Sequence, residues 1–210
     1  MYKSEIISKL REKKIVTVVR GKTEEEALNI ANACIKGGIT CIEVTYTNPA
    51  ASHVINTLKT TYKNNTHVCI GAGTVLDAPT AKNAIEAGAS YIVSPAFNAE
   101  VATLCNRYAI PYIPGCMTIQ EMITAMEHGS EVIKLFPGSV LGENYIKAIK
   151  SPLPHMSIMV TGGVTLDNAA SWLAKGVDAI GIGGEFNTLA TNNDFDAITA
   201  LSHDFVNAIS

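Results

Sequence analysis

The sequence is organised by a repeated junction in which a helical pattern ends in glycine and a short apolar run follows at once. Four such glycines, at positions 38, 88, 129 and 176, are 50, 41 and 47 residues apart. Glycine after the last helical turn supplies the left-handed backbone that ends a helix. The β-branched run behind it is typical of a buried strand. Each interval therefore holds two strand–helix units, with a weaker junction between them.

With the weaker junctions included, the repeat predicts eight strands, near residues 15–19, 39–45, 67–71, 91–94, 111–114, 131–135, 157–161 and 178–182. Two helix starts are equally clear, because Thr23 with Glu26 and Thr118 with Glu121 have the spacing of a capping box. Ahead of the first strand, the apolar residues at positions 6, 7 and 10 predict a short extra helix.

Alternating strands and helices predict an α/β fold with a parallel sheet. Eight such units most often close into a (β/α)₈ TIM barrel, with the extra helix at its N-terminal end. The alternative is an open doubly wound sheet, which usually has five or six strands and would leave units over. No linker or low-complexity segment divides the chain, so we expect one barrel domain over residues 1–210.

Charge and composition exclude several classes of protein. A net charge of −3 gives no general attraction for nucleic acid or for an anionic membrane. The longest run without a charged residue, 151–166, contains two prolines and two glycines and does not predict a membrane span. Residues 1–14 are charged throughout and lack the apolar stretch of a signal peptide, so we expect a cytoplasmic protein.

The cysteines and histidines predict neither a metal site nor a redox site. The five cysteines are odd in number, widely spaced and without a C-x-x-C pair, which is typical of reduced core thiols. The five histidines share no metal-ligand spacing. Charged residues make up 17% of the chain, below the roughly 25% of a typical soluble domain. Part of the surface is therefore a candidate for burial against other copies of the chain.

Two predicted strands carry a charge inside an apolar run. Because residues alternate between the two faces of a strand, Glu43 and Lys134 are expected to point into the barrel. Such side chains are almost never buried unless they are paired. One interpretation is a structural salt bridge. The other is a catalytic pair, in which a desolvated lysine attacks a ketone to form a Schiff base and the carboxylate moves protons.

Glycine-rich segments follow the last two predicted strands. Thr161, Gly162 and Gly163 follow the seventh, and Gly183 and Gly184 follow the eighth. Exposed backbone amides after strands 7 and 8 are a common phosphate site in this fold. A tight turn is the alternative for each pair alone, but their placement on both strands favours phosphate binding.

Two further polar residues fall at strand ends. Thr74 lies in a Gly-Ala-Gly-Thr-Val segment that does not complete a dinucleotide fingerprint, so its hydroxyl is expected at the mouth of the barrel. Arg20 follows the last residue of the first predicted strand. One interpretation is a solvated side chain, and the other is a guanidinium that binds an anion over the pocket.

Taken in order, these segments resemble the KDPG/KHG aldolases, which are class I pyruvate aldolases. They act on 2-keto-3-deoxy-6-phosphogluconate (KDPG) and on 4-hydroxy-2-oxoglutarate (KHG). The resemblance covers essentially the whole chain and is carried by Ile-Glu-Val-Thr at 42–45, Gly-Ala-Gly-Thr-Val at 71–75, Ser-Pro at 94–95, Ile-Pro-Gly at 113–115, Ile-Lys-Leu-Phe-Pro at 133–137 and Thr-Gly-Gly at 161–163.

The resemblance implies a role for each matching residue. Lys134 would be the Schiff-base lysine, and Glu43 the general acid and base, acting through a water. The positions that match substrate-binding residues of the family are Arg20, Thr74, Pro95, Phe136, Thr161, Gly162, Gly163, Gly183 and Gly184. In the reaction that the resemblance implies, Arg20 or pocket hydroxyls would hold the carboxylate, and the glycine amides would hold the distal phosphate. The resemblance also implies a (β/α)₈ barrel, a small-molecule 2-keto acid substrate, a homotrimer and no metal or organic cofactor.

Two departures from the family pattern concern the substrate. Many members have an arginine where this chain has Thr47, and many have a serine where this chain has Glu185. A carboxylate beside a phosphate dianion repels it unless it points away. These changes leave the lyase chemistry in place. They leave open an unphosphorylated or differently configured 2-keto-3-deoxy acid, such as the phosphogalactonate.

Two other functions remain open from the residues alone. A phosphosugar isomerase or epimerase would use Glu43 and Lys134 as an acid and base pair without a covalent intermediate. A sugar-phosphate sensor on a decayed barrel would bind without turnover, but it would be expected to lack one of these two residues, and both are present.

Overall fold

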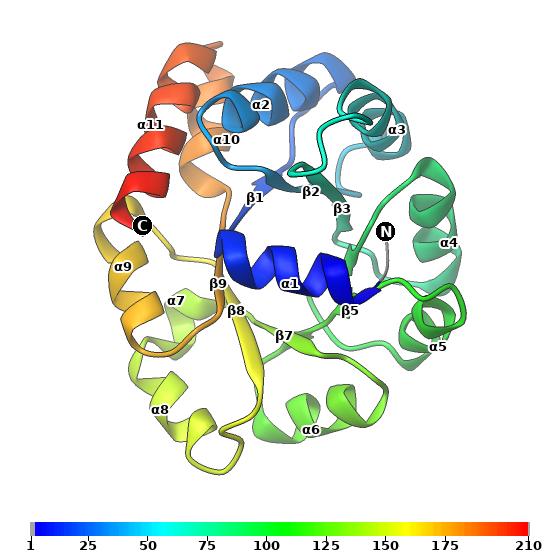
Figure 1. Cartoon of the computed structure of the whole chain (residues 1–210), viewed down its shortest axis with the longest axis vertical. Coiled ribbons are helices and arrows are strands. Elements are labelled where there is room, and N and C mark those ends of the chain that lie inside the picture. Colours follow the sequence, from blue (N-terminus) through cyan, green and yellow to red (C-terminus); the bar gives the residue numbers. More distant parts are fainter. Residues whose placement is uncertain (1–2, 210) are drawn as a thin grey trace.

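A computed structural model describes residues 3–209 as a ring of parallel strands surrounded by helices (Figure 1). The strands are β1 (Ile15–Val19), β2 (Cys41–Thr45), β3 (Cys69–Gly73), β4 (Ile92–Val93), β5 (Tyr112–Ile113), β6 (Gly115–Cys116), β7 (Val132–Leu135), β8 (Ser157–Thr161) and β9 (Ala179–Ile182). The helices are α1 (Lys3–Lys13), α2 (Glu24–Lys36), α3 (Ala51–Thr61), α4 (Ala78–Ala87), α5 (Ala99–Arg107), α6 (Ile119–Glu127), α7 (Gly138–Leu141), α8 (Asn144–Lys150), α9 (Leu166–Ala174), α10 (Gly184–Thr191) and α11 (Phe195–Ala208).

The sheet closes on itself through one interrupted strand. Its order is β5-β4-β3-β2-β1-β9-β8-β7-β6, and each neighbouring pair in it is parallel. β5 and β6 stand at the two ends of that order, yet only Pro114 separates them in the chain. Proline has no N–H to donate to a ladder, which accounts for the break. Its carbonyl accepts from the Lys134 N–H at 2.9 Å, and the Gly115 N–H donates to Ser94 on the other side at 2.9 Å. The predicted (β/α)₈ barrel is confirmed.

Two predicted strands begin two residues later than expected, because turns take their first backbone donors, while the other boundaries at strand starts differ by at most one residue. The Ile39 N–H donates to the Cys34 carbonyl at 3.0 Å and so closes the end of α2, which moves the start of β2 from 39 to 41. The His67 N–H donates to the Asn65 side chain at 3.1 Å, and β3 runs over 69–73 rather than 67–71.

Of the two predicted capping boxes, only the one that begins α6 is complete. The Thr118 hydroxyl accepts from the Glu121 N–H at 3.3 Å, and the Glu121 carboxylate accepts from the Thr118 N–H at 2.8 Å. At α2, the Thr23 hydroxyl accepts from the Glu26 N–H, but the Glu26 carboxylate accepts from the Lys22 N–H instead. That expectation was half right, because the carboxylate reaches one residue further back.

The larger hydrophobic core fills the layer between the strands and the outer helices. The alternation in β2 is as predicted, since Ile42 and Val44 are fully buried in this outer layer and Glu43 lies on the other face. A smaller cluster fills the barrel itself. It joins α1 to inward residues of the strands through Ile6, Ile7, Leu10, Val16, Cys41, Cys69, Tyr91, Val93, Ile113, Val132, Met159 and Ala179.

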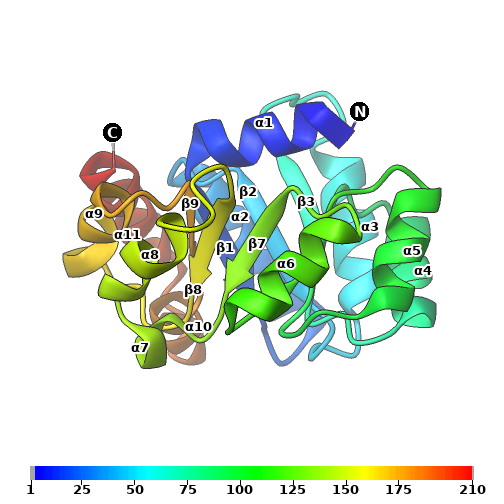
Figure 2. The ribbon, with the colours of Figure 1, turned by 90° about the horizontal axis from the view of Figure 1, so that it is seen from below.

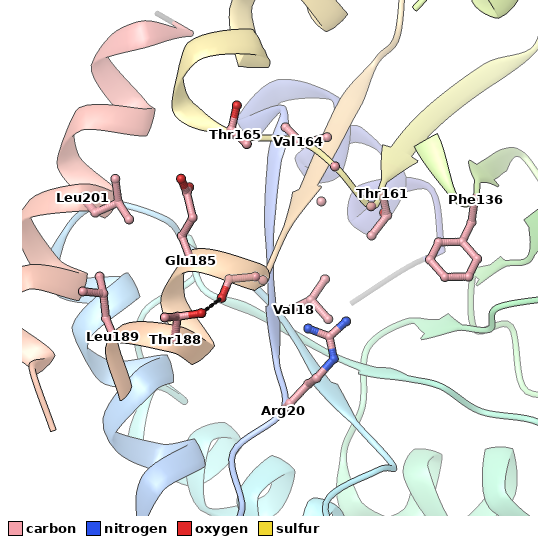
Figure 3. Close-up of a pocket in the computed structure, with 15 residues that line it drawn as sticks. Val18, Arg20, Phe136, Thr161, Val164, Thr165, Glu185, Thr188, Leu189 and Leu201 are labelled. Carbon is pink, nitrogen blue, oxygen red and sulfur yellow. Dashed lines mark hydrogen bonds between the residues drawn. The ribbon is translucent and has the colours of Figure 1, made fainter. Parts of the chain in front are cut away.

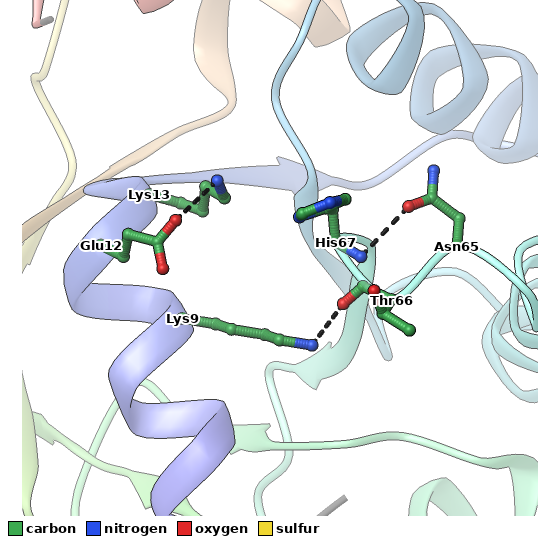
Figure 4. Close-up of polar contacts among 6 residues, drawn as sticks. All are labelled: Lys9, Glu12, Lys13, Asn65, Thr66 and His67. Atoms are coloured by element: carbon green, nitrogen blue, oxygen red, sulfur yellow. Dashed lines mark hydrogen bonds and ion pairs between the residues drawn. The ribbon is translucent and has the colours of Figure 1, made fainter.

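The predicted N-terminal helix, α1, lies across the end of the barrel where the strands begin (Figure 2). Its apolar side is buried in the inner cluster, and its polar side is tied to the loop before β3. There the Lys9 ammonium donates to the Thr66 carbonyl, beside His67, while Lys13 pairs with Glu12 on the helix itself (Figure 4). No helix within residues 3–209 is both long and apolar enough to cross a membrane.

Candidate active site

The barrel is open at the end opposite α1, where the strands finish. A cavity of about 670 Å³ lies there, beside the exits of β1, β8 and β9. Arg20, Phe136 and Thr161 lie on one side of it, and Leu189 and Leu201 lie on the other (Figure 3). The C-terminal end of the strands is where enzymes of this fold carry their active sites.

Glu43 and Lys134 meet inside the barrel, as the alternation predicts. The Lys134 Nζ lies 3.6 Å from Glu43 Oε1, and the two side chains are only 7% and 1% exposed. The Lys134 Nζ also lies 5.3 Å from the centre of the Phe136 ring, which lines the cavity. Neither Glu43 oxygen accepts a hydrogen bond from any residue that the structure describes. Lys134 is thus a buried amine next to a carboxylate, and both oxygens of that carboxylate can still accept a hydrogen bond from a water or a ligand.

Space for the Glu43 carboxylate comes from Gly73 in β3, while Gly71 in the same strand leaves space for the Tyr91 ring. A Cβ added at Gly73 would lie 2.0 Å from Glu43 Oε1, and one at Gly71 would lie 2.3 Å from the Tyr91 ring. Sequence reasoning placed this Gly-x-Gly segment at a strand exit and missed its role. The available signal was the spacing, since glycines two apart in a strand clear the same face for a close approach.

The Thr161 hydroxyl lies inside the barrel at the end of β8. Its oxygen is buried and makes no hydrogen bond with the residues of range 3–209. The oxygen lies close to the backbone of β9, as shown by the 2.5 Å that would separate it from a Cβ added at Gly181. A buried hydroxyl without a partner costs free energy, so this group is available to a water or a ligand.

The glycine segments after β8 and β9 line the same cavity as Arg20. Gly162 and Gly163 have φ angles of +89° and +81°, a backbone region that other residues rarely adopt. A Cβ at Gly183 would lie 2.7 Å from the Val18 carbonyl oxygen and 3.2 Å from the Arg20 guanidinium. The positively polarised N-terminus of α10, which starts at Gly184, also faces this region.

Glu185, in the first turn of α10, lies at the cavity with its carboxylate pointing away from Arg20, on the side of Thr165 and Leu201 (Figure 3). One of its oxygens is buried and accepts no hydrogen bond from the described residues. Burial, and secondarily the nearby Asp167 carboxylate, raise the pKa of Glu185 above its ordinary value. The repulsion expected between this side chain and an anion near Arg20 is therefore reduced by its direction.

Thr74 and Pro95 lie at the same end of the barrel, directly after β3 and β4, but they do not line this cavity. Thr74 has a φ of +55°, which is costly for a β-branched residue and is found where a site requires it. Thr47, two residues beyond the end of β2, is exposed, and its hydroxyl shares a hydrogen bond of 2.7 Å with the Thr45 hydroxyl. No group of three or more His, Cys, Asp or Glu side chains within residues 3–209 is arranged to hold a metal ion.

Comparison with known proteins gives a family match over nearly the whole chain. The family model described as KDPG and KHG aldolase matches residues 6–201. The 2-dehydro-3-deoxy-phosphogluconate aldolase of Treponema pallidum is 34% identical over 201 residues, or 94% of each chain. The 2-dehydro-3-deoxy-6-phosphogalactonate aldolase of Escherichia coli K12 is 34% identical over 172 residues, covering 81% of this chain and 83% of its own.

Solved structures agree with this match. The KDPG aldolase of Legionella pneumophila, with pyruvate captured at low pH as a covalent carbinolamine intermediate, superimposes with a TM-score of 0.86 at 28% identity. The alignment covers 94% of this chain and 96% of that one. A native KDPGal structure gives a TM-score of 0.84 at 31% identity, covering 92% and 93% of the two chains.

Proposed function

This chain belongs to the family of KDPG and KHG aldolases, and from that premise we propose that it cleaves 2-keto-3-deoxy-6-phosphogluconate through an imine on Lys134. The products are pyruvate and glyceraldehyde 3-phosphate, with 4-hydroxy-2-oxoglutarate as a second substrate that yields glyoxylate. The observation that carries the proposal is the buried contact of 3.6 Å between Lys134 Nζ and Glu43 Oε1.

In the proposed reaction, the Lys134 nitrogen attacks C2 of the keto acid. Loss of water from the resulting carbinolamine leaves an iminium, which draws electrons from the C3–C4 bond. The attack requires the neutral, nucleophilic form of the amine. The carbinolamine of pyruvate in the Legionella pneumophila relative supports this first step.

Glu43 moves the protons. It accepts the proton of the C4 hydroxyl, directly or through a water, as the C3–C4 bond breaks. The bond's electrons pass to the iminium, which yields an enamine of pyruvate and the free aldehyde. Protonation of the enamine at C3 and hydrolysis of the imine then release pyruvate and restore the Lys134 amine. The unpartnered Glu43 oxygens support this role, since they are free to accept.

The remaining site residues bind the two ends of the substrate. Thr74, Pro95, Phe136 and Thr161 are proposed to line the pyruvate pocket. The amides of Gly162, Gly163, Gly183 and Gly184 are proposed to hold the distal phosphate. Arg20, expected from the sequence to bind the carboxylate, is instead proposed to bind this phosphate, because it lines the same cavity beside the N-terminus of α10. The phosphogalactonate is the competing substrate, since the relative of that name is as similar as the phosphogluconate enzyme.

Borohydride trapping tests the imine. The protein is incubated with pyruvate and borohydride, and intact mass and peptide mapping are expected to find one pyruvate adduct on Lys134. The control is Lys134→Met combined with Glu43→Gln, because the single Lys134 variant leaves a buried carboxylate unpaired at a cost of about 3–5 kcal/mol. The double variant is expected to fold, by circular dichroism, and to give neither adduct nor cleavage. If the folded wild type gives no adduct but still binds phosphorylated sugars, a phosphosugar isomerase or epimerase is favoured instead.

The same assays decide the finer points. The rate of cleavage of the phosphogluconate is compared with that of the phosphogalactonate and of 4-hydroxy-2-oxoglutarate, and the first is expected to be the fastest. Activity is expected to survive EDTA, because imine chemistry needs no metal.

We also propose a homotrimer. Light scattering should then give three times the mass of one chain, and a monomer would exclude it.

A further inference from the structure

The loop that carries Arg20 forms backbone hydrogen bonds with two asparagine side chains from other parts of the barrel. This loop follows β1 and leads into α2. Asn187 reaches it from α10, and Asn48 reaches it from the loop after β2. Neither asparagine belongs to one of the family motifs.

Asn187 connects the Arg20 loop to the glycine segment after β9. Its Oδ1 accepts from the backbone N–H groups of Arg20 at 3.0 Å and Gly21 at 3.5 Å. Its Nδ2 donates to the Val18 carbonyl at 3.1 Å and to the Gly183 carbonyl. The amide faces two donors with its oxygen and two acceptors with its nitrogen, so only one orientation satisfies all four contacts.

Asn48 holds the same loop from the other side. It is 1% exposed, and its Nδ2 faces the carbonyls of Arg20 at 3.1 Å, Gly21 at 3.2 Å and Thr23 at 3.1 Å. Its Oδ1 accepts from the Ala50 N–H at 2.8 Å. A buried amide with every polar atom satisfied fixes the backbone it touches.

The two asparagines hold the backbone of Arg20, whereas its side chain is exposed. The position of the guanidinium therefore depends on how firmly this loop is held. Ordering a mobile loop around an anion costs conformational entropy, and that cost subtracts from affinity, so a loop whose backbone is already held avoids it. The Arg20 guanidinium also lies close to Gly183, where an added Cβ would be 3.2 Å from it. Arg20 and Gly183 thus face one ligand position from two neighbouring strand exits. The ladder between β1 and β9 ends at Thr17 and Ile182. Beyond that point the Asn187 side chain bridges the two segments.

We propose that Asn187 is a positioning residue for the substrate's distal anionic group. Without touching the substrate, its amide holds the Arg20 loop and the Gly183 segment at the separation that a phosphate requires, and Asn48 secures the far side of the Arg20 loop. This inference rests on the proposed function, because it assigns Arg20 and Gly183 to phosphate binding. It concerns only the tail of the substrate and leaves the Lys134 and Glu43 chemistry unaffected.

The experiment compares two reactions in Asn187→Ala and Asn187→Asp. Exchange of the methyl hydrogens of pyruvate in D₂O, followed by NMR, needs the imine but no phosphate. Cleavage of 2-keto-3-deoxy-6-phosphogluconate needs both. The expected result is pyruvate exchange within twofold of the wild type, with a KM for the phosphorylated substrate about tenfold higher and kcat nearly unchanged.

The matched control is Asn106→Ala. Asn106 Nδ2 also links two segments, donating to the His128 carbonyl at 2.8 Å, but it lies at the end of α5, where the strands begin. Its replacement is expected to leave both reactions unchanged. A fall in thermal stability of the Asn187 variants without a rise in KM would mean a structural role only and would overturn the inference.

A double-mutant cycle with Arg20→Ala tests whether Asn187 acts through the arginine. The increase in KM of Arg20→Ala with Asn187→Ala is expected to be smaller than the product of the two single increases, because both changes disable the same contact. A full product would overturn the inference. If the wild type neither exchanges nor cleaves, the proposed function fails. If it does both and Asn187→Ala keeps its KM, only the role of Asn187 fails.

Discussion

The substitution Gly73→Ala tests whether the close packing of the Glu43 carboxylate against β3 controls its chemistry. The added Cβ would lie 2.0 Å from Glu43 Oε1 and 2.6 Å from Glu43 Cδ, where an ordinary contact begins at 3.4 Å. The oxygen must therefore withdraw by about 1.4 Å, since the backbone of β3 is fixed between two ladders. A misplacement of about 1 Å can cost a factor of about 10² in rate. We expect kcat for cleavage to fall about 10²-fold, with a loss of stability of about 1–3 kcal/mol from overpacking.

The assay separates the carboxylate from the lysine. Borohydride trapping of pyruvate on Lys134 should persist in Gly73→Ala, while proton exchange at the pyruvate methyl group and cleavage both slow. The control is Gly71→Ala, which adds the same methyl to the same face of β3 but meets the Tyr91 ring at 2.3 Å. It should lose stability with a smaller effect on kcat.

Shortening the carboxylate provides a second control. In a Glu43→Asp background, the side chain is one methylene shorter, so the added Cβ has less to displace and Gly73→Ala should cost little further activity. If Gly73→Ala stays folded and cleaves within threefold of the wild type, the close packing of Glu43 on β3 does not control its chemistry.

Three further expectations concern the thiols, the cavity and a helix cap. Burial raises the pKa of the Cys34 thiol to about 11 and the pKa values of Cys69, Cys105 and Cys116 to about 12. In the unfolded chain these thiols ionise near pH 8.5, so the unfolded state gains about 1.4 kcal/mol per thiol for each pH unit above that value. The urea midpoint should fall steeply between pH 8 and pH 10, and equal midpoints would contradict this. Because the Glu185 carboxylate points away from Arg20, Glu185→Ser should lower KM for the phosphorylated substrate by no more than about twofold and leave pyruvate exchange unchanged. A fall in KM of about tenfold or more would show that the carboxylate repels the phosphate despite its direction. Thr118→Ala should cost about 1 kcal/mol in urea denaturation through loss of the α6 capping box, with unchanged kcat.

The parts of the site that follow from periodicity could be predicted from the sequence. Alternation along a strand fixes which side chains face inward, so the strand pattern alone places Glu43 and Lys134 in the interior of the barrel. The helix-ending glycines mark where most strands start. The two late starts, at Cys41 and Cys69, depend on backbone donors being taken by a turn, and a hydrophobic pattern carries no such information.

The parts that depend on register between strands could not be predicted. Gly71 lies opposite Glu43, and Gly73 opposite Thr45, only because β2 and β3 pair in that register. Asn187 is 167 residues from Arg20 in the chain, and three of its four contacts depend on where α10 lies relative to the end of β1. Nothing local distinguishes such an asparagine from one on the surface. The split strand at Pro114, by contrast, has a local signal, since a proline in a central strand removes one ladder donor.

The helix α1 that seals one end of the barrel has a kinetic consequence. With Ile6, Ile7 and Leu10 packed into its floor, the barrel over residues 3–209 is closed where the strands begin, and substrate is expected to enter and leave where they end. In the proposed reaction, the pyruvate fragment held at Lys134 lies deeper in the barrel than the aldehyde fragment held near Arg20. The aldehyde therefore lies between pyruvate and the open end. The aldehyde must leave before pyruvate, and in the reverse direction pyruvate must enter first. Pyruvate should therefore inhibit cleavage competitively with substrate, while the aldehyde should inhibit it noncompetitively.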